Sequence, residues 1–73
     1  MKNVILVFRT SVSTIKDVER VSVILNKCPQ IMTWNIDLED WEKVLRIECR
    51  ENLKATDISI MLKDIDICIS ELE

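Results

Sequence analysis

The sequence predicts an α+β domain of the ferredoxin-like type, a βαββαβ sandwich in which a four-stranded antiparallel sheet carries two helices on one face. Apolar residues alternate at positions 2–9 and 43–50, which is typical of strands. Apolar residues recur every three or four positions within 15–28, which is typical of a helix, and a second helical segment follows at 56–63. Two right-handed crossovers around a central hairpin join these elements into one small domain, residues 1–73.

The first half of the chain predicts a strand and a helix. The strand at 2–9 is apolar on both faces, so we expect it to be central in the sheet. We expect Thr14 to be the N-cap of the helix, with the carboxylate of Asp17 in the first turn. Pro29 ends the helix at about Lys27. The expected apolar face of this helix consists of Ile15, Val18, Val21, Leu25 and Cys28.

The second half of the chain predicts a hairpin, a helix and a last strand. Strands at 31–38 and 43–50 are joined by the short acidic link E-D-W-E. The second helix runs from about Thr56, its expected N-cap, to Lys63. The alternating segment 65–72 predicts a fourth strand, and a continuing helix is the alternative. The residues expected to face the core are Trp34, Ile36, Leu38, Leu45, Ile47, Cys49, Ile58, Met61, Leu62, Ile65, Ile67 and Ile69.

Composition excludes several classes of function. The chain has no histidine, which excludes Ser-His-Asp and Cys-His catalysis, and no glycine, which excludes glycine-rich phosphate loops. A net charge of -3 without a basic stripe gives little support for nucleic-acid binding. No apolar run approaches the roughly 18 residues of a membrane span. We therefore expect a cytoplasmic protein that is not an enzyme, has no cofactor and binds neither nucleic acid nor membrane.

Three segments occur together in an order and spacing that are known from one family. They are V-E-R-V-S-V-I-L at 18–25, W-N-I-D-L at 34–38 and K-V-L-R-I-E at 43–48. With them, nearly the whole chain resembles the heavy-metal-associated domain, the fold of copper chaperones and of the N-terminal modules of metal-pumping ATPases. The resemblance implies the ferredoxin-like fold and a role in handling metal ions.

The resemblance also places the family's metal loop, M-x-C-x-x-C, in this chain. The buried methionine of the loop falls on Val12, and its two cysteines fall on Thr14 and Asp17. A hydroxyl and a carboxylate are hard ligands, whereas Cu(I) prefers soft thiolates. We therefore expect a degenerate loop without a metal, in which Thr14 and Asp17 cap the helix. Binding of a polar ligand or partner at Thr14, Lys16 and Asp17 is the alternative.

The three cysteines are widely spaced, and no pair has the C-x-x-C spacing. We expect Cys28 and Cys49 to be small core residues. Cys68 has the opposite parity to its apolar neighbours, so we expect it on the open sheet face as the most reactive thiol. A copper- or zinc-handling protein that uses Cys68 together with a partner's cysteine is therefore the alternative to a domain without metal.

Two apolar features suggest a protein partner, whose identity the sequence does not give. Trp41 lies between charges in the hairpin turn, where it either folds back over the sheet edge or contacts a partner. Ile5 and Val7, with Val44 nearby, form an apolar strip on the sheet face without helices, which suggests a homodimer. A ligand-sensing domain of the ACT type shares this topology but places its ligands near glycine-bearing loops. The predicted function is a non-enzymatic binding or protein-interaction module.

Overall fold

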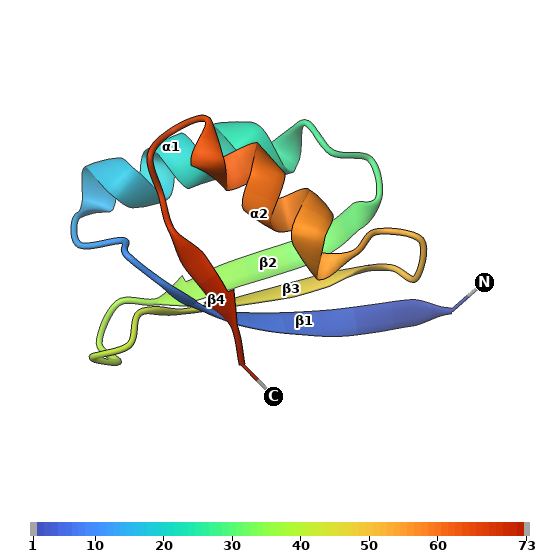
Figure 1. The fold of residues 1–73 in the computed structure, drawn as a ribbon, viewed down its shortest axis with the longest axis horizontal. Helices are drawn as coiled ribbons and strands as arrows, with labels where there is room; N and C mark the ends of the chain where they lie inside the picture. Colours follow the sequence, from blue (N-terminus) through green and yellow to red (C-terminus); the bar gives the residue numbers. More distant parts are fainter. Residues whose placement is uncertain (1, 73) are drawn as a thin grey trace.

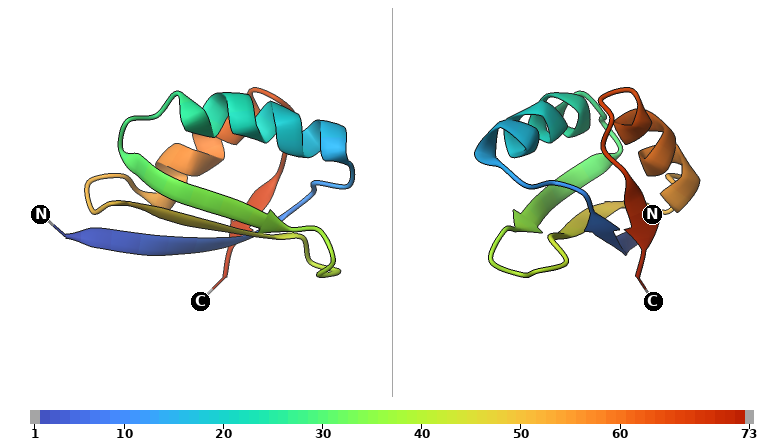
Figure 2. Two further views of the ribbon diagram at one scale, coloured as in Figure 1. Left: turned by 180° about the vertical axis from the view of Figure 1, so that it is seen from behind. Right: turned by 60° about the vertical axis from the view of Figure 1, so that its left-hand side comes forward.

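The computed structural model describes residues 2–72 and confirms the predicted fold class (Figure 1). The four strands form one antiparallel sheet in the order β2-β3-β1-β4, and both helices cover the same face of it (Figures 1 and 2). This is the ferredoxin-like arrangement. The elements are β1 (Asn3–Thr10), α1 (Ile15–Asn26), β2 (Ile31–Asp37), β3 (Val44–Arg50), α2 (Ala55–Lys63) and β4 (Ile69–Glu71).

Strand β1 is central, as its two apolar faces predict. It pairs with β3 from Asn3 to Phe8 and with β4 from Phe8 to Thr10. Strand β2 pairs only with β3, so it forms one edge of the sheet, and the short β4 forms the other. The C-terminal end of β1 is therefore the point at which the sheet, the β1–α1 loop and the last strand meet.

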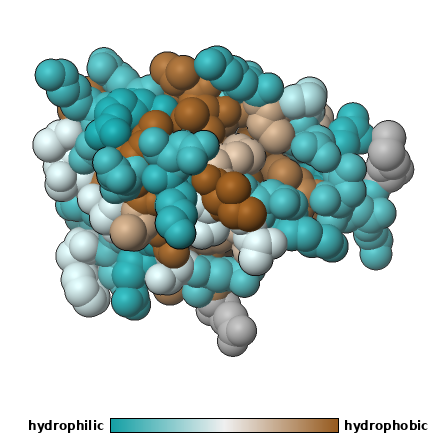
Figure 3. All heavy atoms as spheres, turned by 45° about the horizontal axis from the view of Figure 1, so that its top comes forward, coloured by the Kyte–Doolittle hydropathy of each residue, from teal (hydrophilic) through white to brown (hydrophobic). Residues whose placement is uncertain are grey.

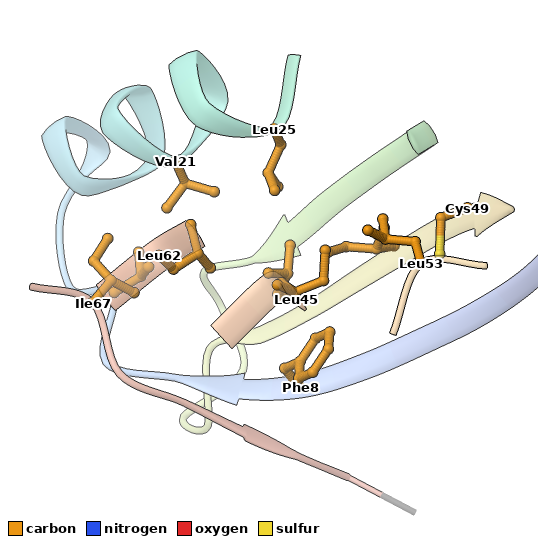
Figure 4. Packing of buried hydrophobic residues seen from close by; sticks show 11 residues of the cluster. Phe8, Val21, Leu25, Leu45, Cys49, Leu53, Leu62 and Ile67 are labelled. Carbon is orange, nitrogen blue, oxygen red and sulfur yellow. The ribbon is translucent and has the colours of Figure 1, made fainter. Parts of the chain in front are cut away.

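The core lies between the sheet and the two helices (Figure 4). The predicted alternation in β3 is confirmed, because Leu45, Ile47 and Cys49 are fully buried. The exception to the predicted core is Ile15, which is 67% exposed, because it is the first residue of α1 and precedes the turns that pack on the sheet. The buried residues are Phe8, Val12, Val21, Leu25, Leu45, Ile47, Cys49, Leu53, Ile58, Leu62 and Ile67.

The predicted N-cap of α2, Thr56, was wrong by two residues. The helix begins at Ala55, so its N-cap is Lys54 and Thr56 lies inside the first turn. A carboxylate oxygen of Asp57 accepts a hydrogen bond from the backbone N–H of Lys54 at 2.9 Å. This bond fixes the helix start through a residue after the cap, which is one half of a capping box.

The predicted fourth strand is shorter than the alternating segment 65–72, since only Ile69–Glu71 is a strand. The continuing helix is wrong as well. The backbone N–H of Asp66 bonds to the carbonyl of Lys63, and that of Ile67 bonds to the carbonyl of Leu62, which is a common way to end a helix. Asp66 has a φ of 60° and takes the left-handed position that glycine usually fills.

Candidate functional site

The β1–α1 loop holds the positions at which the family resemblance places a metal site. Val12, the position to which the resemblance assigns a buried methionine, is buried in the core. The hydroxyl of Thr10 accepts a hydrogen bond from the backbone N–H of Val12 at 3.3 Å and donates one to the carbonyl of Lys43 at 2.7 Å. The loop is therefore fixed on one side to the core and on the other to the β2–β3 hairpin.

Thr14 and Asp17 form the cap that the sequence predicts. The Thr14 hydroxyl oxygen accepts a hydrogen bond from the backbone N–H of Asp17 at 3.2 Å. In return, the carboxylate of Asp17 accepts bonds from the backbone N–H and the hydroxyl of Ser13, at 3.1 and 3.2 Å. Arg20 lies 3.6 Å from the same carboxylate. Both side chains are thus engaged in starting α1, and Lys16 between them is exposed.

The cap also changes the acidity of Asp17. The backbone N–H of Ser13 makes the largest contribution and lowers the pKa of this carboxyl below its ordinary value of 3.8. Partial desolvation opposes this, and the Ser13 hydroxyl and the Thr14 groups lower the pKa further. The ionised form is therefore favoured in the folded state.

We expect Thr14→Ala to lower the free energy of unfolding by about 1 kcal/mol, because it leaves an N–H at the helix start without its acceptor. Urea denaturation followed by circular dichroism measures this. Thr56→Ala is the matched control, since Thr56 lies inside the first turn of α2 and is not its N-cap, and it should cost nothing. Equal losses in the two variants would contradict the assignment of the cap.

The same cap predicts that the stability of the fold depends on pH. Because the pKa of Asp17 is lower in the folded than in the unfolded state, its ionisation stabilises the fold above the unfolded pKa, near 3.8. That contribution disappears as the pH falls through the lower, folded pKa. Asp17→Asn should therefore be less stable than the unaltered chain at pH 7, and the difference in free energy of unfolding should close below pH 3.8. A difference that does not change with pH would contradict this.

The three cysteines are free thiols in three different environments. Cys49 is fully buried as predicted, and burial, with a smaller effect of Cys28, raises the pKa of its thiol. Cys28 does not lie on the face of α1, which ends at Asn26, but it still packs partly buried against the core. Within residues 2–72, no group of three or more histidine, cysteine or acidic side chains could hold a metal ion.

Cys68 is exposed, as expected, but it precedes β4 and lies beside the β1–α1 loop. Its backbone N–H donates to the hydroxyl of Ser11 at 3.0 Å, and its carbonyl accepts from the backbone N–H of Ser11, also at 3.0 Å. Sequence reasoning missed this proximity, since the two residues are 57 positions apart and share no motif. The fold therefore brings Cys68 beside the β1–α1 loop.

The β2–β3 turn lies at the same end of the molecule as the β1–α1 loop (Figure 1). Trp41 in this turn is 86% exposed, so the interpretation that it folds back over the sheet edge is wrong. Trp34 is partly buried against the core, and its indole N–H donates to the side chain of Asn26 at 3.1 Å. The two tryptophans of the chain thus have opposite environments.

The apolar strip on the open sheet face is narrow. Ile5 is 60% exposed and lies opposite Glu48 on β3, and Val7, which is partly buried, lies opposite Arg46. Val44 lies further toward the hairpin, where it pairs with Asp37. Charged side chains therefore border the strip along β3.

Comparisons with known proteins place the fold. No protein-family model matches the chain, and no curated protein matches it. Among solved structures, it is similar to the yeast copper transporter domain CCC2A, solved in solution in the apo and Cu(I)-loaded states. The TM-score is 0.80 over 94% of each chain, at 10% sequence identity. The resemblance inferred from the sequence is thus confirmed at the level of the fold. No helix within residues 2–72 is long and apolar enough to cross a membrane.

Proposed function

We propose that this chain is a non-enzymatic interaction module, built on the fold of a heavy-metal-associated domain, whose β1–α1 loop binds no metal. The observation that carries the proposal is the cap at α1. The resemblance assigns the two cysteine positions of the family to Thr14 and Asp17, and in the structure these side chains bond to the residues around them. A hydroxyl and a carboxylate that already serve as acceptors form a poor site for a soft cation. Three free thiols suit a reducing compartment such as the cytoplasm.

Native mass spectrometry of the reduced protein with and without Cu(I) and Zn(II) tests this proposal. We expect the mass of the metal-free chain under all conditions. Binding of one Cu(I) per chain with nanomolar or tighter affinity would refute the proposal. The same spectra report whether the chain associates with itself.

The second candidate function is metal handling through Cys68, because this exposed thiol lies beside Ser11 in the loop. One thiolate is too few for Cu(I), so a cysteine of a partner protein would have to complete the site. The variant Cys68→Ala separates the two functions. Metal uptake that is present in the unaltered chain and absent in this variant would support the second function, whereas no uptake in either form removes it.

We also propose a contact through the open sheet face, at which two copies of the chain would pair. Ile5 and Val7 supply the apolar strip, and the oppositely charged Arg46 and Glu48 border it on β3. Light scattering at high protein concentration tests for this dimer. A mass equal to the 8.6 kDa monomer at every concentration would count against it.

A further inference from the structure

Trp41 has the most exposed large apolar side chain within residues 2–72. A tryptophan side chain gains more from burial than almost any other, and its indole N–H usually finds an acceptor when it is buried. Trp34 follows that rule, since it packs on the core and bonds to Asn26. Trp41 lies in water at the far end of the hairpin and adds nothing to the core.

The turn that carries Trp41 is rigid within itself. One carboxylate oxygen of Asp37 accepts hydrogen bonds from the backbone N–H groups of Glu39 and Asp40, at 3.1 and 3.3 Å. The side-chain carboxylate of Asp40 in turn accepts a hydrogen bond from the backbone N–H of Glu42 at 2.8 Å. The backbone carbonyl of Asp40 accepts one from the backbone N–H of Lys43 at 2.9 Å. The backbone on both sides of the indole is therefore held by side chains of the turn.

The turn is also fixed to the rest of the domain. Arg9 on β1 makes an ion pair with Glu42 at 2.6 Å, and the backbone N–H of Thr10 donates to the carbonyl of Glu42 at 3.3 Å. The ammonium group of Lys43 donates to the carbonyl of Leu38 at 2.8 Å. An aromatic side chain on a backbone that is already ordered loses little conformational freedom on binding, which is typical of an interface anchor.

The charges around Trp41 indicate the chemistry of its partner. Asp37, Glu39 and Asp40 precede Trp41 in the turn, and within residues 2–72 no ion pair neutralises them. Among the nearby cations, Arg9 is paired with Glu42 and Lys43 donates to a carbonyl of the turn, whereas Arg46 on β3 lines one pocket with Asp37 and Asp40 without an ion pair to either in the described part of the chain. The indole is thus bordered by negative charge, which favours a basic surface and disfavours anionic lipid.

We propose that this acidic turn, residues 37–42, is a docking anchor for a partner protein, which receives the indole of Trp41 in an apolar pocket rimmed by lysine or arginine. The inference rests on the proposed function as an interaction module and specifies where and with what chemistry the module binds. The apolar anchor supplies most of the affinity, and the carboxylates speed and orient the encounter.

The first experiment locates the contact. A photo-crosslinking amino acid with an aromatic side chain, which keeps a large apolar ring at position 41, replaces Trp41, Ile60 or Ile5 in three full-length variants, which are irradiated in the cells that produce the protein. Ile60 on α2, 66% exposed, is the matched control on another surface. We expect a protein crosslinked through position 41 and not through position 60. A partner captured from position 5 or 60 alone overturns this inference but leaves the proposed function standing. Capture from none of the three overturns both.

The second experiment measures affinity with the purified partner by titration calorimetry. We expect Trp41→Ala to weaken binding by at least tenfold, and Glu39→Lys to weaken it and reduce its dependence on salt. Glu39 is suitable because its side chain makes no hydrogen bond within residues 2–72. Ile60→Ala should bind like the unaltered chain. Binding of Trp41→Ala within twofold of the unaltered chain, or binding strengthened by Glu39→Lys, overturns the inference.

Discussion

We expect the double substitution Thr14→Cys and Asp17→Cys to give the chain a Cu(I) site that the unaltered chain lacks. The two positions are three residues apart at the start of α1, next to the buried Val12, so the variant has V-x-C-x-x-C where the resemblance implies M-x-C-x-x-C. Thiols at a helix N-terminus have lowered pKa values, and thiolates are the ligands that Cu(I) prefers. Native mass spectrometry under reducing conditions should show one Cu(I) per chain.

The controls separate the new site from the existing thiols. Each single substitution supplies one thiolate and should bind Cu(I) far more weakly than the double variant. The double variant with Cys68→Ala should keep its metal, because the site does not need the neighbouring thiol. Without metal, the double variant should be less stable by at least about 1 kcal/mol, since it loses the Thr14 cap and also the bonds of the Asp17 carboxylate to Ser13. A double variant that binds no Cu(I) would show that this loop does not share the family's geometry.

The largest loss of stability should come from Phe8→Ala, at about 3–5 kcal/mol. Phe8 is 1% exposed and lies on the central strand, opposite Leu45 of β3 and Glu71 of β4. Its ring lies in the core beside Leu45 (Figure 4). The total free energy of unfolding of a native protein is only about 5–15 kcal/mol, so the variant should be largely unfolded in mild denaturant. Urea denaturation measures the difference in free energy of unfolding.

Trp41→Ala is the matched control, because it removes an aromatic side chain that is 86% exposed. We expect its free energy of unfolding to stay within about 0.5 kcal/mol of that of the unaltered chain. A loss above about 1 kcal/mol would show that the indole packs on the domain, as the rival interpretation from the sequence held. It would also remove the main support for the docking anchor.

The helical face of the domain is mostly polar, with apolar side chains between α1 and α2 (Figure 3). Ile60 and Val23 are exposed large apolar residues on these two helices. No charge pattern or neighbouring segment points to a particular partner for them. Ile60 is therefore a suitable control position, because it is exposed and apolar like Trp41 but lies on another surface.

Local patterns in the sequence determined the elements that depend on neighbouring residues, namely strands with their buried faces and the cap of α1. The alternation of Leu45, Ile47 and Cys49 predicts both the strand and its buried face, since side chains of a strand point alternately to opposite sides. Thr14 with Asp17 predicts the cap of α1, because a cap involves only residues within one turn. The apolar run at 2–9 predicts a central strand, and its place between β3 and β4 confirms this.

Only the tertiary structure decided the features that depend on distant residues. Cys68 lies beside Ser11 because β4 pairs with the end of β1, and no local pattern reports that pairing. The alternation at 65–72 continues through the turn after α2, where the hydrogen bond from the backbone N–H of Ile67 to the carbonyl of Leu62 keeps these residues out of the strand. Whether Trp41 packs or projects depends on how the hairpin is tied to β1, since periodicity fixes the face of a residue within a strand but not the direction of a turn.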